Sequence, residues 1–216
     1  MDITHYGHAC VLVDIPGAGG SVRVLIDPGT YSRDFEGLRD LDLVLITHAH
    51  PDHLDADRLR VLLGDNPDAQ VVHGPGAAPA LAEHAGRTHL AHPGDSRDLA
   101  GVEIAVTGGE HARIHPDLPD SDNNGYLLAG SVFHPGDAFD PPPAPVDTLL
   151  LPAGGPWMKI GESIDYLRSV APRVAIPIHQ AGLAPAHQRM HHHLLGSLAP
   201  AGTDVVVLEH TVPHAL

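Results

Sequence analysis

The chain has 216 residues, of which 43% are hydrophobic, so it is long enough to bury a sizeable core. Its formal net charge of −15 argues against nucleic acid as a main partner, because phosphate binding usually requires a basic surface. No apolar run approaches the roughly 20 residues that cross a bilayer, and an internal disulfide is excluded because Cys10 is the single cysteine. No signal peptide is visible at the N-terminus, and we therefore expect a cytoplasmic protein.

The first half of the chain predicts a series of strands followed by helices. Apolar and β-branched residues predict strands over residues 2–6, 9–15 and 22–27. The run Leu43–Ile46 predicts a buried strand, and residues 55–63 predict a helix. A short strand over 70–73 and an Ala-rich helix to about Gly86 follow, whereas residues 88–101 are expected to be irregular.

The second half predicts more buried strands. Alternation over residues 102–107 predicts a strand, followed by a turn into His111, a polar loop over 116–124 and a hairpin over 125–134. Further strands are predicted at 147–151, 174–178 and 204–208, and helices at 160–170 and about 184–198. This order of elements indicates an α/β fold, which we expect to form one domain over residues 1–216.

A polar turn directly follows the predicted strand Leu43–Ile46. It reads Thr-His-Ala-His-Pro-Asp-His-Leu-Asp over residues 47–55. His48 and His50 lie two apart in extended chain, so their side chains point the same way and can bind one divalent ion. Asp52 and His53 come where the chain turns into the helix and can bind a second ion. Two ions about 3.5–4 Å apart can share a bridging water and polarise a substrate oxygen.

This turn resembles the signature of the metallo-β-lactamase fold superfamily, whose members hydrolyse lactams, thioesters, lactones, phosphodiesters and RNA. Further similarity lies in residues 3–10, 25–28, 134–137, 151–156 and 176–179, so the resemblance covers nearly the whole chain. It is greatest for the bacterial branch that includes ascorbate-phosphate lactonase. The resemblance implies an αβ/βα four-layer sandwich, in which two mixed β-sheets are flanked by helices.

The resemblance also implies metal ligands drawn from distant parts of the chain. The first ion would be held by His48, His50 and His111. The second would be held by Asp52, His53 and His179, and Asp137 would bridge the two ions. His115, four residues after His111, is an alternative third ligand of the first ion.

Three further residues are expected beside the ions. Asp27 would orient the metal loop, because ligands need support from the residues behind them. His8 and Trp157 would lie at the cleft and contact substrate. Structural roles are the alternatives: Asp27 as the cap of its turn, His8 as a buried histidine, and Trp157 as a cover for the edge of the core.

These residues indicate a metal-dependent hydrolase. A dinuclear site lowers the pKa of bound water toward about 7, and the metal-bound hydroxide would cleave an ester, lactone, thioester or phosphodiester bond of a small molecule. Asp52 would orient the hydroxide and then transfer a proton. The His-rich ligand set suits zinc, and manganese or iron also fits. A homo-oligomer is compatible with the sequence.

Two other functions would use the same residues. A di-iron oxidoreductase of this fold is disfavoured, because such proteins carry Glu where this chain has His50 and also contain a flavodoxin domain. A non-catalytic metal-binding module would bind ions but turn over no substrate.

Overall fold

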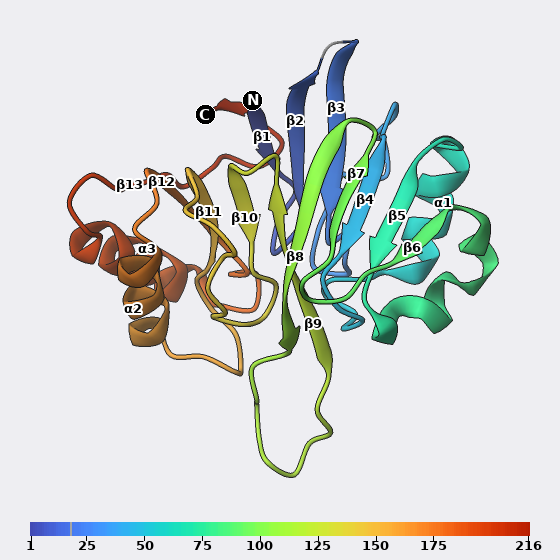
Figure 1. The fold of residues 1–216 in the computed structure, drawn as a ribbon. Coiled ribbons are helices and arrows are strands. Elements are labelled where there is room, and N and C mark those ends of the chain that lie inside the picture. The colour runs from blue at the N-terminus through green and yellow to red at the C-terminus, as the bar shows by residue number, and fades with distance from the viewer. Residues whose placement is uncertain (18) are drawn as a thin grey trace.

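The computed structural model describes residues 1–17 and 19–216. Within this part of the chain, the strands form two seven-stranded sheets that pack face to face, and helices cover both outer sides (Figure 1). The arrangement is a four-layer αβ/βα sandwich, which confirms the fold expected from the sequence. Among the described residues, no helix combines the length and the hydrophobicity needed to span a membrane.

The first sheet has the strand order β14-β1-β2-β3-β4-β5-β6. Its strands are β1 (Asp2–His5), β2 (Val11–Gly17), β3 (Gly20–Ile26), β4 (Leu43–Ile46), β5 (Gln70–His73), β6 (Thr88–Leu90) and β14 (His214–Ala215). Neighbouring strands from β3 to β6 run parallel. Helix α1 (Ala56–Asp65) and the 3-10 helix η1 (Pro75–Arg87) contribute buried side chains to the core on the outer face of this sheet.

The second sheet has the order β13-β12-β11-β10-β9-β8-β7. Its strands are β7 (Ser96–Leu99), β8 (Val102–Glu110), β9 (Asp122–Leu128), β10 (Val132–His134), β11 (Thr148–Pro152), β12 (Val174–Ile178) and β13 (Asp204–Val205). Strands β10 to β13 are parallel. Helices α2 (Ile160–Val170) and α3 (Pro185–Leu198) pack on the outer face of this sheet.

Alternating side chains of β4 join two separate layers of the core. Leu43 and Leu45 pack in the hydrophobic cluster between the sheets. Val44 and Ile46 point the other way and pack against Leu59 and the other buried residues of helix α1. Because both faces are covered, this strand is apolar throughout, as is typical of a parallel strand in a sandwich.

The expectation that residues 88–101 are irregular is wrong, because they contain β6 and β7. Strand β6 is only three residues long, and β7 alternates between exposed and half-buried residues. Both strands lie at sheet edges, where little apolar surface is buried, so their sequence lacks a strong strand pattern. The preceding helix is also a 3-10 helix with Pro79 inside it, and proline cannot donate the backbone hydrogen bond of an α-helix interior.

Two predicted boundaries also differ, and one strand was not predicted. Strand β8 continues through Gly108 and Gly109 to Glu110 and pairs with residues from Asp122 onward, so the predicted polar loop is shorter than expected. At the C-terminus, the predicted strand over 204–208 is limited to Asp204–Val205. The short strand β14, which pairs with β1 near the N-terminus, was not predicted.

Several strand ends meet at one edge of the sandwich. Strands β3 and β4 are parallel, and β10, β11 and β12 are parallel in the other sheet. Strand β8 runs in the same direction as β10, because both are antiparallel to β9. The segments that follow these strands carry the residues singled out in the sequence, so the fold gathers them at a single location.

Replacing Leu150 by alanine tests how much the inter-sheet core contributes to stability. Leu150 is fully buried in the cluster between the sheets, so we expect the variant to lose about 2–5 kcal/mol of unfolding free energy. Val207→Ala is the matched control, because Val207 is 50% exposed and its truncation should change stability by less than about 0.5 kcal/mol. Urea denaturation of both metal-free variants measures the difference, and equal losses would contradict the packing described.

Candidate metal centre

The loop that follows β4 is fixed by the carboxylate that follows β3. The backbone N–H of Thr47 donates to Asp27 Oδ1 at 2.8 Å, and Thr47 Oγ1 donates to Asp27 Oδ2 at 2.7 Å. Since β3 and β4 are neighbouring parallel strands, Asp27 and Thr47 leave the sheet side by side. These hydrogen bonds hold the start of the His-rich turn against the core.

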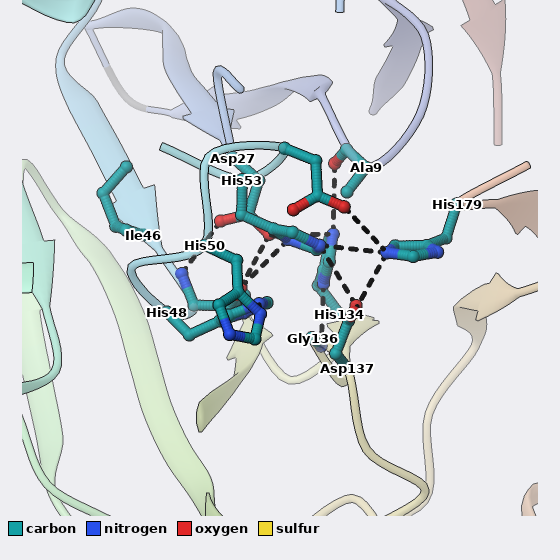
Figure 2. Close-up of polar contacts among 12 residues, drawn as sticks. Ala9, Asp27, Ile46, His48, His50, His53, His134, Gly136, Asp137 and His179 are labelled. Carbon is teal, nitrogen blue, oxygen red and sulfur yellow. Dashed lines mark hydrogen bonds and ion pairs between the residues drawn. The ribbon is translucent and has the colours of Figure 1, made fainter. Parts of the chain in front are cut away.

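The same carboxylate orients the ring of His53 (Figure 2). His53 Nδ1 lies 2.7 Å from Asp27 Oδ2 and donates to it, which leaves Nε2 facing the centre of the site. That nitrogen lies 3.1 Å from His179 Nε2 and 3.1 Å from Asp137 Oδ1. A carboxylate behind a histidine in this way fixes both the tautomer and the ring orientation of a metal ligand.

His48, His50 and His111 form one group of ring nitrogens. One nitrogen from each of the three lies within 4.8 Å of the others, and His48 Nε2 and His50 Nδ1 are 3.0 Å apart. His111 Nδ1 donates to the carbonyl of Ala112 at 2.6 Å. Its Nε2 is buried and has no hydrogen-bond partner.

The structure separates the two candidates for the third ligand of this group. The side chain of His115 is 61% exposed, and its Nδ1 lies 3.6 Å from the exposed Asp117. His111, in contrast, is 5% exposed at its side chain and faces His48 and His50. The geometry therefore favours His111.

A second group contains His8, Asp52, His53 and His179, whose ligand atoms also lie within 4.8 Å of one another. His179 Nδ1 donates to the carbonyl of Gly154, so its Nε2 faces the site. The backbone N–H of Ala181 donates to His8 Nδ1 at 3.3 Å. His8 Nε2 therefore carries the proton and donates to Asp52 Oδ2 at 3.1 Å.

Asp137 lies between the two groups. Its Oδ1 is buried and accepts no hydrogen bond of acceptable geometry, although His53 Nε2 lies 3.1 Å away. Its Oδ2 lies 3.0 Å from His179 Nε2 and 3.4 Å from His111 Nε2. Asn123 Oδ1 accepts the backbone N–H of Asp137 at 3.0 Å. Gly136 permits this approach, because a Cβ at that position would lie 2.0 Å from Asn123 Oδ1.

The charges of the site follow from these contacts. Burial opposes ionisation of Asp137, but His53 and His179 outweigh it and hold its pKa well below the usual range. Burial also opposes a charge on His53, yet Asp137 and Asp27 raise its pKa well above the ordinary value. Burial and the nearby His53 lower the pKa of His48, which stays neutral and available as a ligand.

Asp52 and His8 differ from the buried pair. Despite partial burial, the hydrogen bond from His8 lowers the pKa of Asp52 to about 2. Burial lowers the pKa of His8 to about 4, against the opposing effect of Asp52. At neutral pH, Asp52 is therefore a carboxylate and His8 a neutral hydrogen-bond donor.

Three residues of the site have a left-handed backbone. The φ angles of His8, Asp27 and His179 are 51°, 50° and 61°. Non-glycine residues rarely adopt this region, and each costs roughly 1–3 kcal/mol when the surroundings enforce it. The three residues follow β1, β3 and β12, so the backbone strain lies in the segments that lead from these strands into the site.

The residues present fit divalent metal ions. The unpartnered atoms His111 Nε2 and Asp137 Oδ1 are buried, and a buried polar atom without a partner is costly. Pairs of ring nitrogens also face each other at 3.0–3.1 Å, which is unfavourable for two lone pairs unless a cation or proton lies near them. Imidazole and carboxylate are the donors that first-row divalent metals use.

A family model described as "Beta-lactamase superfamily domain" matches residues 2–179. The chain belongs to this superfamily. It is 43% identical to Protein Rv0786c of Mycobacterium tuberculosis over 98% of this chain and 99% of that protein. It is 26% identical to a UPF0173 metal-dependent hydrolase of Thermoplasma acidophilum, over 83% of each.

Solved structures share the metallo-β-lactamase fold. A metallo hydrolase from the archaeon Ignicoccus hospitalis matches with a TM-score of 0.71 and 23% identity, covering 100% of this chain and 98% of that one. At this level of identity the similarity concerns the fold.

The structure brings together all of the side chains that were predicted as metal ligands. We call these residues the ligand cluster: His48, His50, Asp52, His53, His111, Asp137 and His179. Asp27 lies behind the cluster and His8 beside it, as expected. Trp157 also lies beside the cluster, where its indole N–H donates to Asp137 Oδ2 at 2.7 Å.

Sequence reasoning assigned no role to Thr47 or Asn123. Thr47 belongs to the recognised motif, but its hydrogen bonds to Asp27 depend on the pairing of β3 with β4. Asn123 was placed in a polar loop, whereas it is fully buried in β9 and binds the backbone of Asp137. The only hint of this role in the sequence was that Asn123 is a polar residue just before the predicted hairpin over residues 125–134.

Replacing Asp27 by asparagine tests the support of the metal loop. An amide has one acceptor oxygen, so it cannot accept the three hydrogen bonds that Asp27 receives from Thr47 and His53. We expect a loss of about 3 kcal/mol in the stability of the metal-free protein and weaker metal binding. Asp68→Asn, at an exposed position, removes the same charge and should change neither thermal unfolding nor metal content. Identical behaviour of the two variants would contradict the role of Asp27.

Proposed function

We propose that this chain is a hydrolase that uses two divalent metal ions to cleave a bond in a small molecule. The first ion would be held by His48, His50 and His111, and the second by Asp52, His53 and His179, with Asp137 bridging. The bond would be an ester, lactone, thioester or phosphodiester.

The position of Asp137 carries this proposal. Its two carboxylate oxygens face nitrogens of both histidine groups, with His53 Nε2 at 3.1 Å from one oxygen and His111 Nε2 at 3.4 Å from the other. A carboxylate placed between two sets of ligands can reduce the repulsion between two dications.

When bound, such ions polarise a substrate oxygen and make water nucleophilic near neutral pH. The protein supplies the proton transfer. Asp52 Oδ2 accepts a hydrogen bond from His8 and lies 3.8 Å from His179 Nε2, and the Asp52 side chain is 26% exposed. This carboxylate would therefore be placed to accept a proton from the attacking water. His8 keeps the carboxylate turned toward the cluster, which prepares Asp52 for that role.

The space beside the cluster suits a small substrate. A cavity of about 410 Å³ lies next to the second ligand group, lined by Asp52, His179, Tyr31, Pro156 and Leu183 among others. Another of about 220 Å³ lies next to His50 and His111. The larger volume falls in the range of small-molecule sites, and the net charge of −15 disfavours a polyanion.

Zinc is the ion that we propose first, because histidine is the main donor; manganese and iron remain compatible. The name of the Thermoplasma relative, a metal-dependent hydrolase, supports the reaction class. The similarity to the ascorbate-phosphate lactonase branch stays a prediction, and lactones therefore belong in every substrate panel.

His50→Ala tests the first ligand group. Removing this imidazole takes away one of three converging nitrogens, so we expect loss of metal from the purified protein and a fall in hydrolytic activity of at least about 100-fold. His115→Ala is the matched control, since this exposed histidine lies outside the cluster and should leave both properties unchanged. Wild-type activity in the His50 variant would refute the assignment.

The number of bound ions tests the dinuclear arrangement. After expression with added zinc or manganese, elemental analysis should approach two ions per chain, and dialysis against a chelator should abolish turnover of lactones, thioesters or phosphodiesters. A reproducible value of zero would end the hypothesis. Two bound ions without turnover on this panel would favour the non-catalytic module instead.

A further inference from the structure

Trp157 contacts the carboxylate at the centre of the site. Its indole Nε1–H donates to Asp137 Oδ2 at 2.7 Å. Figure 2 labels Asp137, whose carboxylate is the acceptor. Both side chains are buried, with residue exposures of 8% and 2%. A hydrogen bond to a charged acceptor in such surroundings is strong, so this contact fixes the rotation of the carboxylate.

The other close neighbours of that carboxylate are ring nitrogens of the ligand cluster. His53, His111 and His179 each place an Nε2 atom within 3.4 Å of an Asp137 oxygen. In the proposed function these nitrogens bind ions and cannot donate hydrogen bonds at the same time. Among the described residues, the indole N–H of Trp157 is then the side-chain donor that keeps its contact with Asp137 when metal is bound.

The loop between β11 and α2 is built for this contact. Gly155 lies so close to the indole that a Cβ there would stand 2.8 Å from Trp157 Nε1 and 3.3 Å from His179 Cε1. The neighbouring carbonyl of Gly154 accepts the hydrogen bond from His179 Nδ1. One short loop thus orients two members of the ligand cluster, Asp137 and His179.

Aromatic packing prevents the indole from turning away. Phe139 packs against Trp157 with ring centroids 5.1 Å apart, and Tyr166 packs against Phe139 at 5.0 Å. Tyr166 Oη donates to the carbonyl of Asp140 at 2.7 Å, which ties this stack to the segment after Asp137. Trp157 is also not among the residues that line the cavities bordering His50, His111, Asp52 and His179.

We propose that Trp157 is a positioning residue of the metal centre: its indole N–H holds Asp137 in the orientation that bridges the two ions. The inference rests on the proposed function, because it assumes that Asp137 binds metal. It assigns the tryptophan to the support of the ligands and not to contact with substrate.

Metal affinity measures this role without any knowledge of the substrate. Trp157→Phe retains an aromatic ring but removes the N–H, and we expect zinc affinity to fall by about 10- to 100-fold in competition with a chromophoric chelator. Because Trp157 is the only tryptophan, it can also be replaced by benzothienylalanine, in which sulfur replaces the N–H at nearly the same ring size. The two replacements should weaken zinc binding to a similar extent.

Phe139→Leu is the matched control, since it disturbs the stack but leaves the N–H in place. It should keep zinc affinity close to that of the wild type, whereas a role in packing alone would make this variant the more damaging one. Thermal unfolding of the metal-free proteins shows whether each variant is folded, and the benzothienylalanine protein remains informative if Trp157→Phe is not.

The fluorescence of the wild-type protein provides a second readout. Emission from Trp157 should change in step with zinc occupancy, because zinc binding alters the charge around its hydrogen-bond partner. Unchanged emission at full occupancy, or wild-type zinc affinity in the benzothienylalanine protein, would overturn the inference alone. Absence of zinc binding by the wild type would overturn the proposed function as well.

Discussion

The buried carboxylate of Asp27 is the contact on which the rest of the site depends. It is fully buried and accepts hydrogen bonds from Thr47 and His53, two residues of the loop that follows the neighbouring strand. An isolated buried charge would be costly, and here the compensating donors all belong to the metal loop. The position of the His-rich turn is therefore set by the need to satisfy this one anion.

The second sheet contributes a buried carboxylate to the site as well. Asp137 is a second buried anion, contributed by the opposite sheet, and it faces the far side of the His53 ring. His53 thus lies between two carboxylates. Its Nδ1 is 2.7 Å from Asp27 Oδ2, and its Nε2 is 3.1 Å from Asp137 Oδ1. The two sheets meet at this imidazole, so the site is also a point at which their relative position is fixed.

Local signals in the sequence predicted most strands and helices and the His-rich turn after β4. The four-layer sandwich and the distant residues His111, Asp137 and His179 were implied by the resemblance to a known family, because no local pattern marks them. Apolar strands such as Leu43–Ile46 are easily recognised, and the polar residues that directly follow them stand out. The edge strands β6 and β7 left no such signal, since edge strands bury little apolar surface. The extension of β8 through Gly108 and Gly109 was hidden for another reason: glycine contributes no side-chain pattern.

The supporting contacts could not be predicted, because they depend on tertiary structure. The choice between His111 and His115 required the actual path of the chain after β8. The hydrogen bond from Trp157 to Asp137 joins residues that are 20 apart in sequence, and it depends on the backbone at Gly155. Residue type alone indicated proximity to the cleft but not the direction of the indole N–H.

The left-handed backbone at His8, Asp27 and His179 limits how this centre can be re-engineered. Exchanging one donor for another is the usual route to a different metal preference, yet β-branched or bulky residues are strongly disfavoured in this conformation. Asparagine, aspartate, histidine and glycine tolerate it best. Aspartate can therefore replace His179 at little conformational cost. Most other metal-binding side chains would be strained in this backbone conformation.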